Sequence, residues 1–215
     1  MKMTINEIVS DVMNDFDVAG LLCSRLCHDL VSPVGAITNG LEVLEDDNDP
    51  AMREHAISLI GMSADSATAK LKFMRIAFGA SITMGNEFAA QELTSLASAM
   101  VKGGRVSVDG SALMGPLPKN QAKLLLNMIL LGIEALPRGG VLTVQNSNRS
   151  ITLRCTGTNA ALPEEIVSIL NGVPESTPDH RSIVAFIAQQ LAEELNWALT
   201  HQNSEDCVTL EATAA

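Results

Sequence analysis

The segment His28-Asp29-Leu30-Val31-Ser32-Pro33 carries the residue types best suited to chemistry in this chain of 215 residues. An ordinary histidine is largely neutral at neutral pH, and the free ring nitrogen is a nucleophile that can accept a phosphoryl group. The Asp29 carboxylate can accept the other ring N–H, which fixes the tautomer and stabilises positive charge on the ring. Ser32 could hydrogen-bond a phosphoryl oxygen or position a water. A surface histidine without function is the alternative interpretation.

A long amphipathic helix is expected to carry this segment. At about 100° per residue, His28 lies about 200° from both Leu26 and Leu30, so it should point away from the apolar face and into solvent. From about residue 16 to residue 44 the apolar side chains recur at steps of three or four, which predicts one continuous helix face. Its members are Leu22, Leu26, Leu30, Val34, Ile37, Leu41 and Leu44.

A second helix is predicted after the turn Asp46-Asp47-Asn48-Asp49-Pro50, which is rich in helix-capping residues and has Pro at a first helical position. Two long helices joined by so short a turn should form an antiparallel hairpin. One hairpin cannot bury both apolar stripes, so we expect two copies to associate into a four-helix bundle, a homodimer. The second stripe is Met52, Ala56, Leu59, Ser63, Ala67, Leu71, Met74 and Phe78.

Residues around the histidine on the first helix are candidates for contact with a protein partner. Ser32, Gly35 and Asn39 share the helix side of His28, and these small or uncharged side chains would let another protein approach closely. Arg25 is assigned to the same partner-binding surface.

Basic residues of the second helix should lie near the histidine as well. If the hairpin turns near residue 48, the residue alongside His28 is about Thr68, which brings Lys70, Lys72 and Arg75 close. In an otherwise acidic chain such a patch would attract a phosphorylated acidic partner. A merely solvated helix face is the alternative.

The remainder of the chain, residues 80–215, alternates helix and strand patterns. Strands on one side and helices on the other predict a two-layer α+β domain, behind a hairpin domain of residues 1–79. The expected helices are 87–101, 119–136 and two that begin near 163 and 181, and the expected strands are 105–108, 141–145, 151–155, 198–201 and 207–210.

Composition excludes several classes of function. The chain has 14 basic and 25 acidic residues, a net charge of −11, so we expect no nucleic-acid partner. No apolar run approaches the roughly 18 residues needed to span a bilayer, and no signal-peptide pattern is present. Four cysteines in a chain of this length do not resemble a disulfide framework, so a cytoplasmic protein is expected.

Other metal-ligating or nucleophilic residues are expected to be structural. Cys23 and Cys27 share a helix face beside His28, but no second ligand pair lies nearby, so packing is favoured over a metal site. The three other histidines have no acidic or hydroxyl group placed around them, and all are expected to be surface or partly buried residues. They are His55, His180 and His201.

The His28–Pro33 segment resembles the phosphoacceptor motif of histidine kinases, and the later part is similar to the kinase ATPase domain. The resemblance centres on the helix from Leu125 through the turn Pro137–Gly140. In the kinase pattern a second Asn, four residues after the position of Asn127, helps hold Mg²⁺, and here Leu131 stands there. The adenine-binding Asp-x-Gly-x-Gly is replaced by Cys155-Thr156-Gly157-Thr158-Asn159, and the lid region, residues 178–183, holds no glycine.

This combination resembles the alphaproteobacterial ChpT family of histidine phosphotransferases. The resemblance implies a phosphoacceptor hairpin in a dimeric four-helix bundle, followed by a degenerate histidine-kinase-like ATPase domain. It implies that His28 relays a phosphoryl group and that Asp29 orients its ring. The implied partners are the receiver domain of a CckA-like hybrid kinase and CtrA-like and CpdR-like response regulators. No cofactor is expected in this chain, and Mg²⁺ is expected in the partner's receiver domain.

Two other functions stay open at this level. A divergent histidine kinase would still bind ATP and label His28 without a partner. A non-enzymatic dimeric adaptor would bind receiver domains without taking phosphate.

Overall fold

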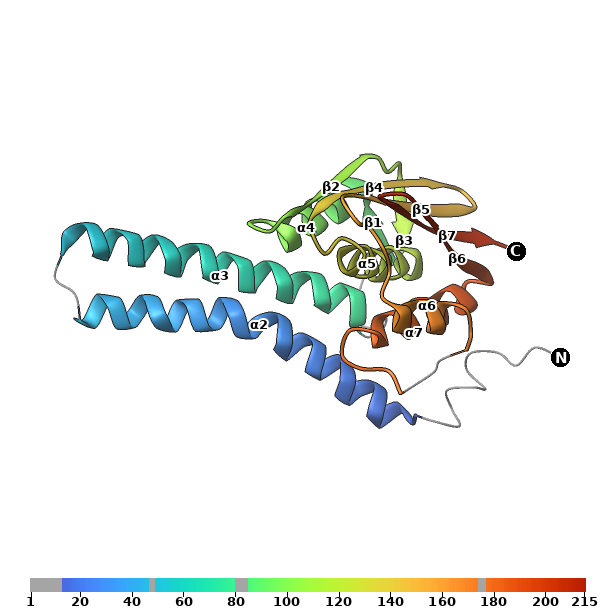
Figure 1. Ribbon diagram of the computed structural model, residues 1–215. Helices are drawn as coiled ribbons and strands as arrows, with labels where there is room; N and C mark the ends of the chain where they lie inside the picture. The colour runs from blue at the N-terminus through green and yellow to red at the C-terminus, as the bar shows by residue number, and fades with distance from the viewer. Residues whose placement is uncertain (1–12, 47–48, 80–84, 174–176) are drawn as a thin grey trace.

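Two long helices project from a compact α/β body (Figure 1). The computed structural model describes residues 13–46, 49–79, 85–173 and 177–215. Helix α2 spans Asp15–Asp46 and α3 spans Pro50–Phe78, which confirms the predicted antiparallel hairpin. The Asp49 side chain accepts a hydrogen bond from the Ala51 N–H and caps α3, and Pro50 occupies its first position.

Small residues line the contact between the two helices of the hairpin. Gly40, Ala56 and Ser63 are buried, and a Cβ on Gly40 would lie 2.6 Å from Cγ1 of Ile60, so the helices approach closely there. Several larger apolar side chains of the hairpin are left exposed by this contact. They are Phe16, Val31, Val34, Leu41, Met52, Ile57, Leu59, Met62 and Leu71.

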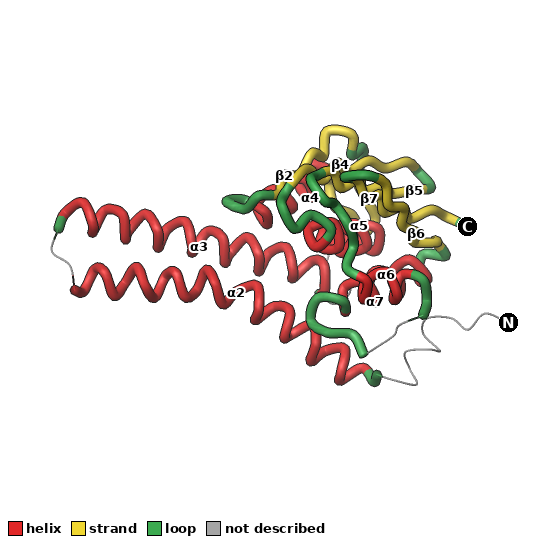
Figure 2. The backbone as a smooth tube through the Cα atoms, in the orientation of Figure 1, coloured by secondary structure: helices red, strands yellow, loops and turns green. Residues whose placement is uncertain are grey.

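The body is a two-layer α+β domain, as predicted. Its five-stranded sheet has the order β2-β4-β5-β7-β6, with β2 parallel to β4 and the other neighbours antiparallel. The helices cover one face of this sheet (Figure 2). The elements are β1 (Glu87–Ala89), α4 (Ala90–Val101), β2 (Val106–Ala112), β3 (Pro116–Pro118), α5 (Lys119–Glu134), β4 (Gly140–Ser147), β5 (Ser150–Thr156), α6 (Glu164–Leu170), α7 (Ile183–Glu194), β6 (Trp197–Ser204) and β7 (Cys207–Ala214).

The start of α4 differs from the prediction. The helix expected from residue 87 begins only at Ala90, because β1 pairs with β3 in a separate two-stranded sheet. This pairing buries Phe88 against the core and places Leu117 opposite it. Tertiary pairing overrides local helix propensity at these three residues.

One hydrophobic core joins the base of the hairpin to the α/β domain. The last turns of α3 bury Phe73, Met74, Ile76 and Ala77 in the same cluster as the whole central part of α5. The Asn127 amide on α5 strengthens this junction, because its Nδ2 donates to the Ala77 carbonyl at 3.0 Å. The hairpin is therefore held at a fixed place on the domain rather than attached by a free linker.

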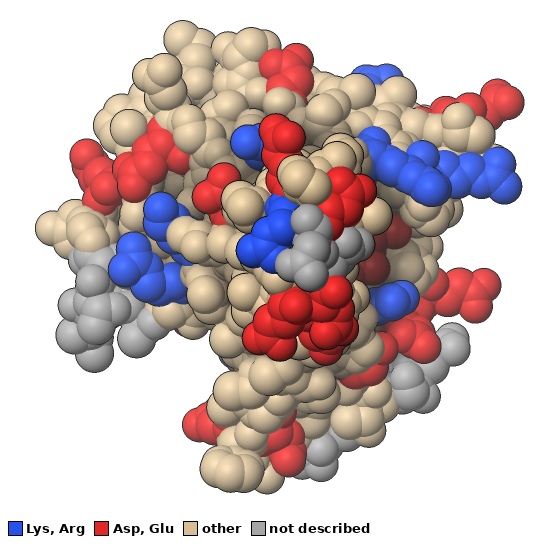
Figure 3. Space-filling model, turned by 90° about the vertical axis from the view of Figure 1, so that its left-hand side faces the viewer, with Lys and Arg blue, Asp and Glu red and all other residues tan. Residues whose placement is uncertain are grey.

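Charges are mixed on the face seen along the hairpin (Figure 3). Lys and Arg side chains occur there in small groups among Asp and Glu, without a broad basic field. None of the helices in the described ranges is long and apolar enough to cross a membrane.

Candidate functional site

The imidazole of His28 lies on the outside of α2, as the helical geometry predicts. Its side chain is 53% exposed, and Nδ1 lies 3.0 Å from Oδ1 of Asp29. A carboxylate only accepts hydrogen bonds, so this contact places the ring proton on Nδ1 and leaves the lone pair of Nε2 free. In this tautomer the nitrogen with nucleophilic character is Nε2, on a ring that is half exposed to solvent.

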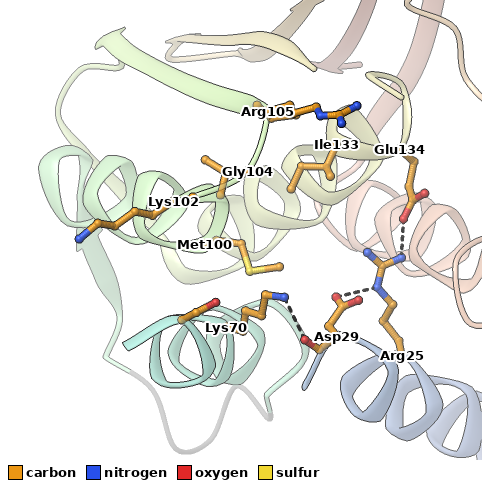
Figure 4. Close-up of a pocket in the computed structure, with 13 residues that line it drawn as sticks. Arg25, Asp29, Lys70, Met100, Lys102, Gly104, Arg105, Ile133 and Glu134 are labelled. Carbon is orange, nitrogen blue, oxygen red and sulfur yellow. Dashed lines mark hydrogen bonds and ion pairs between the residues drawn. The ribbon is translucent and has the colours of Figure 1, made fainter. Parts of the chain in front are cut away.

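Asp29 is held in turn by Arg25, one helical turn earlier. The Arg25 guanidinium donates from Nε to Oδ2 of Asp29 at 3.1 Å, and from its Nη1 to Oε1 of Glu134 at 2.8 Å (Figure 4). Glu134 is the last residue of α5, so the network His28–Asp29–Arg25–Glu134 links the hairpin to the α/β domain.

The position of Arg25 corrects its assignment to the partner-binding surface. Only 4% of the residue is exposed, and its guanidinium is engaged by two carboxylates of the same chain. A guanidinium that is buried and already paired is not available to an incoming protein.

The other predicted partner residues fall into two groups. Ser32 and Asn39 are exposed and Gly35 is half-buried, all on α2. On α3, Lys70 lies against the turn of α2 that carries His28 and Asp29, because its Nζ donates to the Asp29 carbonyl at 2.9 Å.

Lys72 and Arg75 are exposed on α3, and at about 100° per residue they lie about 200° and 140° around the helix from Lys70. Lys72 lines a separate groove between α3 and α4, together with Lys102. The expectation that Lys70 lies near His28 is therefore confirmed. The three cations do not form one cluster, because they lie on different sides of α3.

An open groove runs beside the network of ion pairs. It has a volume of about 450 Å³ and lies between the hairpin, the end of α4 and the end of α5 (Figure 4). Its lining includes Arg25 and Lys70 from the hairpin, and Lys102 and Arg105 from the segment that follows α4.

A second groove of about 560 Å³ opens at His28 itself. Its other walls come from the end of α5, the segment before α6 and Arg181. His180 precedes Arg181 in the chain. The centroid of its ring lies 4.8 Å from that of the His28 ring, and the two ring planes are 43° apart.

His180 is partly buried, as expected, but it is not isolated from polar groups, because the His28 ring and the Asp179 carboxylate both lie near it. The missed signal is the spacing Asp179-x-x-Ser182 in front of an apolar helix, which is a capping pattern that fixes the turn carrying the histidine.

The positions that correspond to the kinase nucleotide site are filled by core packing. Leu131 and Cys155 are fully buried, and both amide hydrogens of Asn127 go to the carbonyls of Ala77 and Lys123. Burial, with a smaller effect of Cys207, raises the pKa of the Cys155 thiol to about 12. A neutral buried thiol cannot replace the carboxylate that accepts a hydrogen bond from adenine.

Residues 90–207 match the family model for the histidine phosphotransferase C-terminal domain. The chain is also 36% identical over 202 residues to the protein phosphotransferase ChpT of Brucella abortus (strain 2308), covering 91% of this chain and 95% of that protein. The chain belongs to the histidine phosphotransferase family.

The solved structure of a bacterial phosphotransferase agrees with this assignment. A bacterial phosphotransferase structure superposes on this histidine phosphotransferase with a TM-score of 0.79 and 33% identity, covering 94% of this chain and 98% of that one. The histidine kinase domain of a blue-light activated kinase from Erythrobacter litoralis gives a TM-score of 0.46 at 13% identity, over 85% and 93% of the two chains.

In this histidine phosphotransferase, substitution of Arg25 by Met is expected to destabilise the fold by about 3 kcal/mol, because it leaves two partly buried carboxylates without a counter-ion. Adding Glu134→Leu should recover part of the loss by removing one of them. Urea unfolding of the two variants measures both effects. Arg154→Met, at an exposed sheet position, is the control and should change stability by less than about 0.5 kcal/mol. Equal effects of Arg25→Met and Arg154→Met would contradict the structural role of the network.

Proposed function

We propose that His28 is the phosphoacceptor of a relay between receiver domains. Its Nε2 attacks the phosphorus of an aspartyl phosphate, an N–P bond forms, and the electron pair of the broken P–O bond returns to the aspartate carboxylate. The reverse step, with a second receiver, delivers the group onward. The observation that carries this proposal is an exposed imidazole whose Nδ1 faces the Asp29 carboxylate at 3.0 Å.

Asp29 supplies the electrostatic part of this chemistry. Phosphorylation of Nε2 leaves the ring cationic while the proton stays on Nδ1, so no proton needs to leave. The negative charge of Asp29 stabilises that cation at the position where it develops. Arg25 fixes the carboxylate from its other oxygen, so little reorganisation is needed during transfer.

The receiver domain would bring the metal ion. Within the described ranges, no group of three or more His, Cys, Asp or Glu side chains is placed to hold one. Mg²⁺ in the receiver would neutralise the phosphoryl oxygens during transfer, and Ser32, exposed one helical turn after His28, would contact one of them. By resemblance we propose a CckA-like hybrid kinase as donor and CtrA-like and CpdR-like regulators as acceptors, which would act in the cytoplasm.

We further propose that the chain does not phosphorylate itself from ATP. Leu131 has no metal-ligating atom, and the buried Cys155 thiol cannot accept a hydrogen bond as a carboxylate would. The two amide hydrogens of Asn127 are taken by the carbonyls of Ala77 and Lys123, and its amide oxygen is buried in the core. A nucleotide site would need polar groups at positions that this fold uses for packing.

Label transfer from a phosphorylated receiver domain tests the phosphoacceptor. Wild type should gain acid-labile label, His28→Gln should gain none, and Asp29→Asn should slow transfer by about 10- to 100-fold through loss of the ring's charge partner. His55→Gln, at an exposed site on α3, is the control and should transfer normally. Label on His28 from ATP alone would favour a divergent kinase, and intact signalling by the His28 variant would favour an adaptor.

Basic residues on α3 are proposed to steer the acidic partner. Lys72→Glu with Arg75→Glu should slow association several-fold at low ionic strength, and the difference should shrink as salt is added. Stopped-flow binding of the receiver measures this. The control, Arg149→Glu with Arg154→Glu, makes the same change in net charge on the exposed β4–β5 hairpin. If both pairs give the same rate, local steering by α3 is wrong.

We also propose that two copies associate through their hairpins. The contact between the two helices of one hairpin includes the small residues Gly40, Ala56 and Ser63. Larger apolar side chains such as Val34, Leu41 and Leu59 are left exposed to solvent. A second hairpin with the same stripes would cover them in a four-helix bundle.

Light scattering coupled to size exclusion tests this association. The wild type should elute at twice the 22.8 kDa of one chain, and Leu41→Glu with Leu59→Glu should elute as a monomer, because buried unpaired carboxylates oppose the interface. The control Met114→Glu with Val173→Glu replaces exposed apolar residues of the α/β domain and should remain dimeric. A wild type that is monomeric at micromolar concentration would exclude the bundle.

A further inference from the structure

His180 is a second imidazole at the phosphoacceptor, and it comes from the α/β domain rather than the hairpin. Helix α2 passes the start of α7, and the turn before α7 carries His180 to 4.8 Å from the His28 ring, centroid to centroid. Two histidines so close, supplied by different parts of the fold, need a physical reason.

The turn that holds His180 is rigid. The Ser182 N–H donates to Oδ1 of Asp179 at 2.7 Å, and the Asp179 N–H donates back to Oγ of Ser182 at 2.8 Å. The Arg181 N–H donates to the same carboxylate at 2.8 Å. Burial alone would raise the pKa of Asp179, but the hydrogen bonds from Ser182 and Arg181, helped by the nearby His180, hold it below its usual value. An ionised Asp179 thus fixes the backbone around His180.

Neither ring nitrogen of His180 makes a hydrogen bond with the described residues in this state. Its Nε2 is buried and has no hydrogen-bond partner among the described residues. Its Nδ1 lies 3.9 Å from Oδ2 of Asp179, which is too long for a hydrogen bond. A buried polar atom without a partner is unfavourable, and a phenyl ring would pack here without that cost. The residue type therefore indicates a partner that is present in another state of the protein.

Phosphorylation of His28 would bring such a partner. The phosphoryl group adds three acceptor oxygens beside the His28 ring, and the groove of about 560 Å³ that opens at His28 leaves space for it. The charged groups around this place are of both signs. Glu134 and Asp29 are paired with Arg25, Arg181 in the same groove is positive, and Glu164 at its wall is negative, so a hydrogen-bond donor there would help to hold a phosphoryl group.

We propose that His180 binds the phosphoryl group carried by His28, with its ring N–H donating a hydrogen bond to a phosphoryl oxygen. This inference rests on the proposed role of His28 as the phosphoacceptor. No bond to phosphorus forms at His180 and no proton is lost from it; the N–P bond belongs to His28 throughout. The α/β domain thereby holds the phosphorylated state and keeps the group oriented for the next aspartate.

The lifetime of phosphorylated His28 should depend on this hydrogen bond. A hydrogen bond that is stronger to the phosphorylated ring than to the transition state of P–N cleavage stabilises the former more, and it therefore slows hydrolysis. Loss of one charge-assisted hydrogen bond should shorten the lifetime about tenfold. A residue that only packed against His28 would need a ring at this position but no donor.

The test uses the full chain phosphorylated with potassium phosphoramidate, and decay is followed by phosphate-affinity electrophoresis. His180→Phe keeps the ring and removes the donor, and it should decay about tenfold faster than wild type. His180→Gln keeps an N–H and should stay within about threefold of wild type, while His180→Ala should behave like the Phe variant. His55→Gln is the matched histidine control on an exposed face of α3.

Each outcome decides between roles. A Phe variant as long-lived as wild type shows that His180 only packs, and the proposal is wrong. If thermal unfolding shows that the Phe variant is not folded, the comparison of Gln with Ala decides, and equal lifetimes overturn the proposal. If neither phosphoramidate nor a phosphorylated receiver labels wild-type His28, it is the proposed function that fails, and the role of His180 fails with it.

Discussion

The buried guanidinium of Arg25 is the interaction on which the geometry of the site depends. Asp29 and Glu134 come from different helices, and without a cation between them the two carboxylates would repel each other and separate the hairpin from α5. The planar guanidinium of Arg25 donates hydrogen bonds to both carboxylates. It thereby sets the position of the turn that carries His28 on the α/β domain. Such a buried ion pair adds little net stability compared with apolar packing, so its value lies in fixing geometry. The other charged groups of this turn, Arg25 and Asp29, point toward the α/β domain, while the His28 ring stays exposed to solvent.

The α/β domain acts as a support for this turn. Its central helix α5 is buried along most of its length, ends in Glu134 and fills with leucines the space that a nucleotide domain would need for polar groups. The turn before α7 brings His180 to the same place. The domain therefore contributes side chains to the environment of His28.

Much of this arrangement follows from sequence patterns, and the rest follows from packing between distant segments. The period of three and four residues gave both hairpin helices within about two residues, and the angle between His28 and the leucine face gave its exposure. The short strands β1 and β3 could not be predicted, because three residues carry no periodic signal and their pairing is tertiary. Arg25 was misassigned because its burial is caused by Glu134, a residue far away in the sequence. His180 was missed for the same reason.

The packing of Cys155 and Gly132 has a consequence for how this protein could change. A Cβ on Gly132 would lie 2.8 Å from a methyl of Leu153 and 3.0 Å from the sulfur of Cys155, so helix and sheet already touch there. Aspartate at position 155, the first residue needed to read adenine, would bury a carboxylate in an apolar wall with no room for water. The proposed dependence on an outside source of phosphate would therefore be hard to reverse by stepwise mutation, because the substitution that restores this carboxylate first lowers the stability of the fold.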